Sequence, residues 1–320
     1  MKKLGIALLA TAGLLGLAAC GNGSSDPSTS TSTPPRQTYA VITHASAGDA
    51  FWDRVKSGVE RAGQDYGVTV TYVGDPDPAR QAQLIDNAVA QRVDGIVVSM
   101  ANPDGLEASL QRAAQAGVPF VTINSGIERW QEFGAITHIG QSETIAGRSV
   151  GQRLKAEGWT NVLCVIHEAG NVGHEERCAA VRETMGGTVS NVQVDANDDA
   201  QVKATLKARL QGDPTIDGIL TLGAQYGVDA VGAVEESGAQ AQVATFDLTE
   251  DVVEAVLAGQ ILFAVDQQPY AQGYLGITVL HLNDINGNDV GGGQPVYSGP
   301  SYVTAENAAG VLQWAKNGTR

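Results

Sequence analysis

The sequence predicts an α/β protein made of two doubly wound units, each built on a parallel sheet. Short runs of β-branched and aromatic residues alternate, from Tyr39 onward, with stretches whose apolar residues recur three and four positions apart. This alternation is typical of parallel strands joined by crossover helices. Beyond its N-terminal region the chain is long enough for one large or two medium domains.

The first unit contains four β-branched runs, each bounded by Gly, Pro, Asp or Asn. We expect strands at residues 39–44, 68–73, 95–100 and 118–124. One-faced helices are expected between them, at residues 51–66, 78–91 and 104–116.

The same pattern then restarts, which predicts a second unit of similar construction. The restart follows a strand at 136–140. It begins with a helix near 143–157, and strands are then expected at 162–167, 188–194, 217–222 and 242–247, with helices between them. A third passage comprises a strand at 261–267, a helix at 269–282, short strands at 295–298 and 301–304, and a final helix near 305–316.

The N-terminus has the composition of a secretory signal. Lys2 and Lys3 precede an apolar run, Leu4–Ala19, and the segment Leu17–Cys20 resembles a lipoprotein lipobox. A transmembrane helix is the alternative, but the run is shorter than the ~20 residues that a bilayer core requires. We therefore expect a signal peptide at 1–19, lipid attachment at Cys20 and a Gly/Ser/Thr/Pro-rich tether at 20–37, which place the protein outside the cytoplasm, anchored by lipid to a bacterial membrane.

Charge and cysteine content exclude several classes of function. The formal net charge of −15 argues against nucleic acid or an anionic lipid surface as a partner. Cys164 and Cys178 remain after Cys20; in an exported protein a disulfide between them is expected, with the packing of two free thiols as the alternative. No metal site is expected, because no His or Cys pair has ligand spacing.

Polar residues gather where the predicted strands end. In open parallel sheets, ligands bind beyond the carboxyl ends of the strands. Those ends carry residues 44–52, 99–102, 124–126, 167–177, 223–226, Asp247 and 266–267. Amides, carboxylates and aromatic rings dominate this set, and they suit the hydroxyls and C–H faces of a sugar.

Several segments, taken in order, resemble the type I periplasmic sugar-binding proteins of ABC importers, the ribose- and galactose-binding group. The markers are GDAFWDRVKSGVERA, DGIVVSMANPDGL, AGVPFVTINS, HIGQSETIAGRSVG, ATFDLTED and DQQPYAQGYLG. The resemblance implies two lobes joined by three hinge crossings, near Gln141-Ser142, Gln267 and Ser298. Lobe one would then be 38–141 plus 268–297, and lobe two 142–267 plus 298–320.

The resemblance also implies ligand contacts. Asp247 and Gln267 agree with family residues, whereas Asp49 and Asn124 replace a family Asn and Asp. The other expected ligand-binding residues are His44, Phe51, Trp52, Asn171, Glu175, Arg177 and Gln225.

Departures from the family put a ribose ligand in doubt, because Ser125 and Glu175 stand where ribose-binding proteins have arginines. Simpler roles remain open for some of these residues. Phe51 and Trp52 suit a hydrophobic core, and Asp49 suits a helix N-cap.

We therefore expect a solute-binding lipoprotein of an ABC importer that captures a small neutral sugar or polyol by hinge closure. The expected partners are a permease with its ATPase, and the protein is expected to be a monomer without cofactor or catalytic residues. Neither a His-Glu-x-x-His pair nor a Gly-Lys-Ser/Thr phosphate loop occurs. The alternative is a sensory receptor that presents a sugar-like or furanosyl signal to a membrane kinase or chemoreceptor.

Overall fold

The structure is a computed structural model that describes residues 36–320. The expected signal peptide at 1–19, the lipid attachment at Cys20 and nearly all of the tether at 20–37 lie outside the described residues. Within residues 36–320, none of the helices is both long enough and apolar enough to cross a bilayer.

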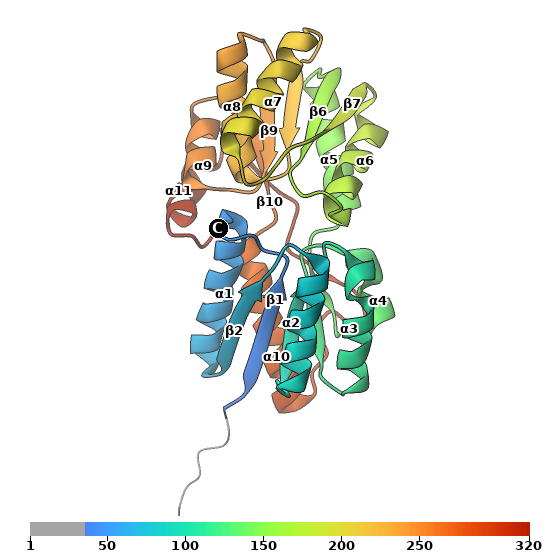
Figure 1. Cartoon of the computed structure of the whole chain (residues 1–320). Helices are drawn as coiled ribbons and strands as arrows, with labels where there is room; N and C mark the ends of the chain where they lie inside the picture. Colours follow the sequence, from blue (N-terminus) through green and yellow to red (C-terminus); the bar gives the residue numbers. More distant parts are fainter. Residues whose placement is uncertain (1–35) are drawn as a thin grey trace, which may run out of the picture. The chain divides into compact units, whose positions relative to one another are not determined.

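The first sheet has six strands in the order β11-β5-β4-β3-β1-β2, all parallel (Figure 1). Its strands are β1 (Thr38–Thr43), β2 (Thr69–Gly74), β3 (Gly95–Ser99), β4 (Phe120–Ile123), β5 (His138–Gly140) and β11 (Val296–Tyr297). The helices of this lobe are α1 (Ala50–Tyr66), α2 (Pro78–Ala90), α3 (Pro103–Gln115), α4 (Trp130–Phe133) and α10 (Pro269–Asn286), with a 3-10 turn at Ile127–Arg129.

The second sheet repeats this strand order as β12-β10-β9-β8-β6-β7, except that β12 runs antiparallel to β10. Its strands are β6 (Asn161–Ile166), β7 (Thr188–Gln193), β8 (Gly218–Thr221), β9 (Gln242–Phe246), β10 (Phe263–Asp266) and β12 (Ser301–Thr304). Its helices are α5 (Glu143–Ala156), α6 (Val172–Met185), α7 (Asp199–Gly212), α8 (Ala224–Ser237), α9 (Glu250–Leu257) and α11 (Ala308–Lys316).

Each sheet has a buried apolar core on both faces, as a doubly wound sheet requires. The predicted fold class is confirmed. Two elements differ from the expectation. The turn and helix over residues 127–133 are too short to show a period, and α10 continues to Asn286 because no stop signal appears before Gly287, its left-handed C-cap.

Helices α1 and α10 approach each other closely because two glycines lie at their contact. A Cβ on Gly58 would lie 2.1 Å from the carbonyl oxygen of Tyr270, and one on Gly273 would lie 2.1 Å from that of Val55. This contact fixes the position of α1, whose first turn faces the second sheet (Figure 1).

The chain passes between the two sheets at three places: after β5, after β10 and between β11 and β12. The Ser298 N–H donates to the Gly140 carbonyl at 2.8 Å, and the Ser298 hydroxyl donates to the Gln267 carbonyl at 2.7 Å. The Gln272 amide donates to the same Gln267 carbonyl at 2.9 Å. The three crossings are therefore hydrogen-bonded into one layer, called here the hinge layer (residues 140–143, 266–269 and 298, with Gln272).

Cys164 on β6 and Cys178 on α6 form a disulfide, with Cα atoms 5.9 Å apart. The bridge ties α6 to the sheet just beyond the loop that carries His167, Glu168 and Asn171.

Candidate ligand-binding site between the two sheets

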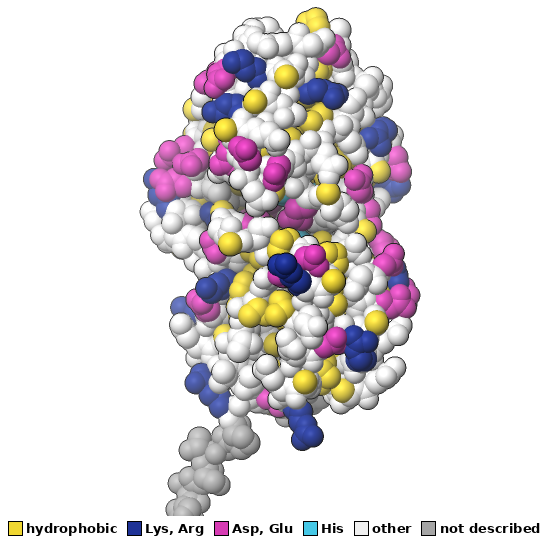
Figure 2. All heavy atoms as spheres, in the orientation of Figure 1, with side chains coloured by type: hydrophobic (Ala, Val, Ile, Leu, Met, Phe, Trp, Pro, Cys, Tyr) yellow, Lys and Arg dark blue, Asp and Glu magenta, His cyan; other side chains and the backbone are white. Residues whose placement is uncertain are grey.

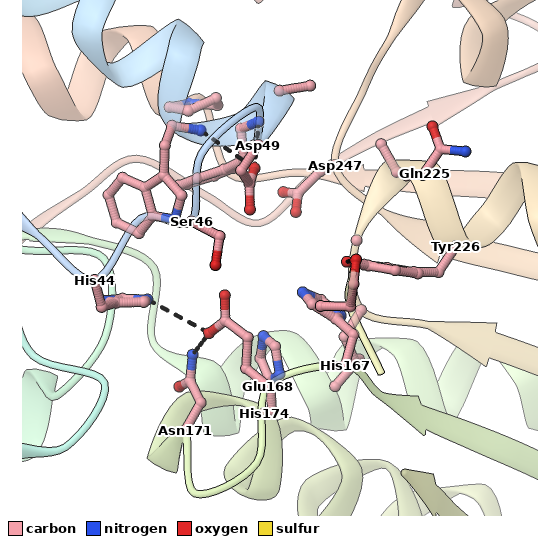
Figure 3. Close-up of a pocket in the computed structure, with 18 of the residues that line it drawn as sticks. His44, Ser46, Asp49, His167, Glu168, Asn171, His174, Gln225, Tyr226 and Asp247 are labelled. Carbon is pink, nitrogen blue, oxygen red and sulfur yellow. Dashed lines mark hydrogen bonds and ion pairs between the residues drawn. The ribbon is translucent and has the colours of Figure 1, made fainter. Parts of the chain in front are cut away.

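A cavity of about 270 Å³ lies where the carboxyl ends of the two sheets face each other. Its walls come from the loop and first turn of α1, the β6–α6 loop, the start of α8, and the ends of β4, β9 and β10. Figure 2 shows acidic side chains and a trace of histidine in the hollow between the sheets, and Figure 3 shows the wall residues converging on one space.

The first-sheet wall is formed by the N-terminus of α1. Asp49 caps this helix: its Oδ1 accepts hydrogen bonds from the N–H groups of Phe51 at 2.8 Å and Trp52 at 3.4 Å. Its other oxygen lines the cavity (Figure 3). Asp49 therefore caps the helix and still leaves one oxygen for a ligand, so the two roles suggested by the sequence are compatible.

Trp52 and His44 complete this wall. The His44 ring stands edge-on to the Trp52 ring, with centroids 4.7 Å apart, and its Nδ1 lies 2.7 Å from the Ser99 hydroxyl. Trp52 is only 4% exposed, so the same ring belongs to the core of the lobe and to the edge of the cavity.

The second-sheet wall is a stack of rings. His167 lies against Tyr226, with centroids 4.2 Å apart, and against His174, with centroids 4.4 Å apart. Burial lowers the pKa of His167 to about 3 and that of His44 to about 4, and it also lowers the pKa of His174, so these histidines are neutral at physiological pH. The Nδ1 atoms of His167 and His174 are buried without a hydrogen-bond partner in the described part of the chain.

A chain of side chains crosses the floor of the cavity from one lobe to the other. The Asn124 amide donates to Gln267 Oε1 at 3.1 Å, and the Gln267 amide donates to Asp247 Oδ1 at 2.8 Å. Asn124 and Asp247 follow β4 and β9, which hold equivalent places in the two sheets.

Asn124 and Asp247 also share an unusual backbone conformation, with φ of 65° and 68°. Asn and Asp tolerate this left-handed region better than most residues. Strained backbone of this kind clusters at functional sites.

Arg177 lies beneath this floor and is held by a buried carboxylate. Its guanidinium makes a bidentate pair with Glu143, one bond of which is 2.9 Å, and both side chains are almost fully buried. The Gln141 amide donates to the same carboxylate at 3.0 Å. The charge of Arg177 is therefore matched within the protein.

Glu168 enters the cavity from the β6–α6 loop and was not among the expected ligand-binding residues. Its Oε2 accepts a hydrogen bond from the Asn171 amide and lies 3.6 Å from His44 Nε2 across the lobes. Glu168 comes directly after a predicted strand. Because ligands bind beyond the carboxyl ends of parallel strands, this position could have identified Glu168 as a candidate.

Three carboxyl groups in the cavity have raised pKa values. Burial is the main cause in each case; it raises the pKa of Asp247 to about 7 and that of Asp49 to about 6, and it raises the pKa of Glu168. Nearby Arg177 opposes the shift at Asp247, and the charge of Glu168 adds to the shift at Asp49. The cavity is therefore rich in acceptor oxygens, and burial disfavours the charged form of their carboxyl groups.

The structure brings nearly all of the expected residues to the cavity: His44, Asp49, Phe51, Trp52, Asn124, Asn171, Arg177, Gln225, Asp247 and Gln267. Glu175 lies outside it. The Glu175 side chain is exposed on α6 between buried His174 and buried Arg177, and it accepts a hydrogen bond from Asn191 at 3.3 Å. Besides Glu168, the cavity also contains Ser46, Arg54, Asn197 and Asp199, which the sequence analysis did not single out.

The sequence also contains a Gly-x-Ser-x-Gly pattern at 147–151. In hydrolases this pattern marks a sharp strand-to-helix turn. Here it lies inside α5, where the Ser149 hydroxyl is 2.9 Å from that of Tyr302, so it is not a nucleophile elbow. Within residues 36–320, no group of three or more His, Cys, Asp or Glu side chains is arranged to hold a metal ion.

Comparison with known proteins gives consistent results. The periplasmic binding protein domain family matches residues 39–285. A carbohydrate transporter from Acidothermus cellulolyticus 11B, whose crystal structure is a complex with myo-inositol, is 41% identical; the match covers 89% of this chain and 100% of that one, with a TM-score of 0.88.

Two curated relatives are more distant. A xylitol-binding protein from Mycolicibacterium smegmatis is 23% identical over 96% of this chain and 86% of its own length. A xylose/arabinose-binding protein from Sulfolobus acidocaldarius is 23% identical over 64% of this chain, and the match spans 56% of that protein.

Proposed function

We propose that this chain, which belongs to the periplasmic binding protein domain family, captures a ring-shaped polyol of the inositol type outside the cytoplasm and delivers it to an ABC permease with its ATPase. In this proposal the protein is a binding protein and not an enzyme. Cys20 would carry the lipid that anchors the mature protein to the membrane.

The observation that carries this proposal is the set of carboxylate oxygens left free inside a small cavity. In each of Asp49, Glu168 and Asp247, one carboxylate oxygen accepts a hydrogen bond from the protein and the other accepts none within residues 36–320. Hydroxyl groups can donate hydrogen bonds to these free oxygens. Every ring carbon of an inositol carries a hydroxyl group. A donor-rich, ring-shaped ligand therefore matches the acceptor-rich walls.

Size and shape support a single ring. The cavity of about 270 Å³ lies just below the ~300–1,000 Å³ that is usual for small-molecule sites. Rings of Trp52 on one side and of His167 and Tyr226 on the other provide flat apolar surfaces for the C–H faces of such a ligand. The crystallised relative, whose structure contains myo-inositol, supports the same ligand class.

Closure of the two lobes supplies the mechanism. Contacts already cross between the lobes at His44 and Glu168 and between the Ser125 hydroxyl and Asn171 at 3.3 Å. A ligand that touches both walls has higher affinity for the closed arrangement and shifts the population toward it. The hinge layer is where the chain would bend.

Transport is favoured over sensing by the described relatives, one of which is a carbohydrate transporter. Deletion of the gene should abolish uptake of labelled ligand by cells if the protein serves import. Intact uptake, with loss of a transcriptional or chemotactic response, would favour the sensory alternative.

Thermal unfolding of residues 21–320 tests the ligand class. The panel comprises myo-inositol, other cyclitols, xylitol, aldopentoses and aldohexoses. A ligand at about 100 times its Kd stabilises the native state by about 2.7 kcal/mol, which corresponds to a rise of roughly 4 °C in a protein of about 300 residues. We expect this rise with a cyclitol, and no rise across the whole panel would contradict the proposal.

A further inference from the structure

The cavity contains more negative charge than a neutral ligand requires. Asp49 and Asp247 each commit their Oδ1 to protein donors, and Glu168 commits its Oε2. The second oxygen of each accepts no hydrogen bond from any residue in the range 36–320, and Figure 3 shows all three carboxyl groups directed at the same space.

Neither arginine in the cavity lining donates a hydrogen bond to these three carboxyl groups. Arg177 forms an ion pair with Glu143, a carboxylate outside the cavity lining. Arg54 lines the cavity and its charge acts on Asp247 and Asp49, but its guanidinium donates to the backbone carbonyls of Ala50 at 2.7 Å and Arg320 at 2.9 Å and to no carboxyl group of the cavity. Both positions at which ribose-binding proteins have arginines are occupied here by Ser125 and Glu175.

The charge balance can be stated from every element that faces the cavity. Asp49, Glu168, Asp199 and Asp247 are acidic, Arg54 and Arg177 are basic, and the remaining titratable groups are His44, His167, His174 and Tyr226. Asp199 is exposed to solvent and the buried histidines are neutral. The three remaining acids, Asp49, Glu168 and Asp247, are therefore opposed by Arg54 and by an Arg177 already paired with Glu143.

We infer that the preferred ligand carries a protonated amine in place of one ring hydroxyl, as an aminocyclitol or amino sugar does. An ammonium group donates up to three hydrogen bonds and brings the positive charge that the cavity lacks. A hydrogen bond in which an ion takes part is roughly twice as strong as a neutral one, and here both partners are charged. This inference rests on the proposed function and narrows its ligand class.

Glu168 is the carboxylate best placed to receive the amine. Asp49 also caps α1 and Asp247 also holds Gln267, whereas Glu168 reaches in from a loop, with a side chain 24% exposed, and is tied only to Asn171 and His44. We therefore expect its charge to decide between an amine and a hydroxyl at the same ring position.

The experiment compares matched pairs of ligands by isothermal titration calorimetry of residues 21–320 at pH 6.5. The pairs are myo-inositol with an aminodeoxyinositol, D-glucose with D-glucosamine, and D-galactose with D-galactosamine. In the pair that binds, the amine should bind at least 10-fold more tightly than its neutral partner. Glu168→Gln should reduce this ratio by at least 5-fold, while Glu175→Gln, which removes the same charge from the outside of α6, should leave it unchanged.

Proton exchange gives an independent readout in the same titrations, repeated in two buffers with different ionisation enthalpies. An ammonium lowers the pKa of the surrounding carboxyl groups, so binding of the amine should release protons from them. Should Glu168→Gln fail to fold, as judged by circular dichroism, Asp247→Asn replaces it in the ratio measurement.

Two results would overturn the inference. If the neutral member binds as tightly as the amine or more tightly, the inference fails while the proposed function stands; uptake of protons on binding would then show that the carboxyl groups accept a neutral ligand by being protonated. If neither member of any pair binds, the proposed function fails, and the inference fails with it.

Discussion

The hinge layer and the cavity walls are both buried, polar and built from the loops that follow strands, yet they treat charge in opposite ways. Beneath the cavity, Glu143 of the hinge layer pairs with Arg177, so that the two buried charges are matched. In the cavity walls, Asp49 and Asp247 each have one carboxylate oxygen that accepts no hydrogen bond from residues 36–320. The difference teaches that a charged side chain in these loops is structural when its charge is paired within the protein, and available for a ligand when one of its oxygens has no partner.

The largest expected effect comes from breaking the ion pair between Glu143 of the hinge layer and Arg177. Glu143→Gln leaves the Arg177 charge buried and unpaired, which should cost about 3–5 kcal/mol of unfolding free energy. Urea denaturation measures it. The matched control is Glu183→Gln, since Arg148 and Glu183 form a 3.0 Å pair more than half exposed and worth about 0–1 kcal/mol. Similar losses in the two variants would contradict the distinction between the regions.

Asp247→Asn should have opposite effects on binding and stability. The cavity would lose a charged acceptor, whose hydrogen bond is worth about 1.5–3 kcal/mol, so affinity should fall about 10- to 150-fold. Without ligand, the same change removes a buried charge while an amide oxygen can still accept from Gln267. Calorimetry with the ligand and urea denaturation without it measure the two effects.

The stability effect of Asp247→Asn should depend on pH. Because burial raises the Asp247 pKa to about 7, the native state holds this proton more tightly than the unfolded chain does, and the contribution of Asp247 to stability falls as pH rises from about 4 to 7. Relative to the wild type, the variant should therefore gain stability between pH 5 and pH 8, by about 1–3 kcal/mol. A constant difference across this range would show that Asp247 is not a strained carboxylate.

Phe51→Leu should have a smaller effect on binding. The ring lies edge-on to Trp52, with centroids 5.0 Å apart, and borders the cavity. An aromatic contact is worth about 0.5–1.5 kcal/mol beyond its buried area, so affinity should fall roughly 2- to 10-fold. Tyr297→Leu, at an aromatic side chain 56% exposed and outside the cavity lining, is the control and should leave affinity unchanged.

Gln225→Ala should have the smallest effect. Gln225 borders the cavity but is exposed at the start of α8, and Figure 3 shows its amide turned away from the acidic groups. Changes at such positions are usually within about 0.5 kcal/mol, or roughly two-fold in affinity. A loss above ten-fold would mean that Gln225 turns inward when the lobes close.

The fold could be predicted well from the sequence because local sequence patterns determine where its helices and strands lie. β-branched runs and one-faced helices repeat along the whole described chain, and the rule that ligands bind beyond parallel strand ends leads directly to Asp49 and Asp247. Both signals depend only on residues close together in the sequence.

The rest depends on geometry that local patterns do not contain. Glu175 lies between two buried residues of α6, and one step along a helix turns a side chain by about 100°, away from the cavity. The direction of Glu168 is set by the fold of its loop. The pairing of Arg177 with Glu143 joins residues 34 positions apart, so the sequence shows neither the pair nor the fact that it neutralises the arginine.

The central claim is that the ligand binds to the carboxylate oxygens of Asp49, Glu168 and Asp247 that accept no hydrogen bond from the protein. A crystal structure of residues 21–320 grown with saturating myo-inositol tests it most directly. We expect one ring between Trp52 and His167, with hydroxyl oxygens of the ligand about 2.5–2.7 Å from the free oxygens of Asp49 and Asp247. A ring bound elsewhere, or one in the cavity that touches none of the three carboxyl groups, would contradict it.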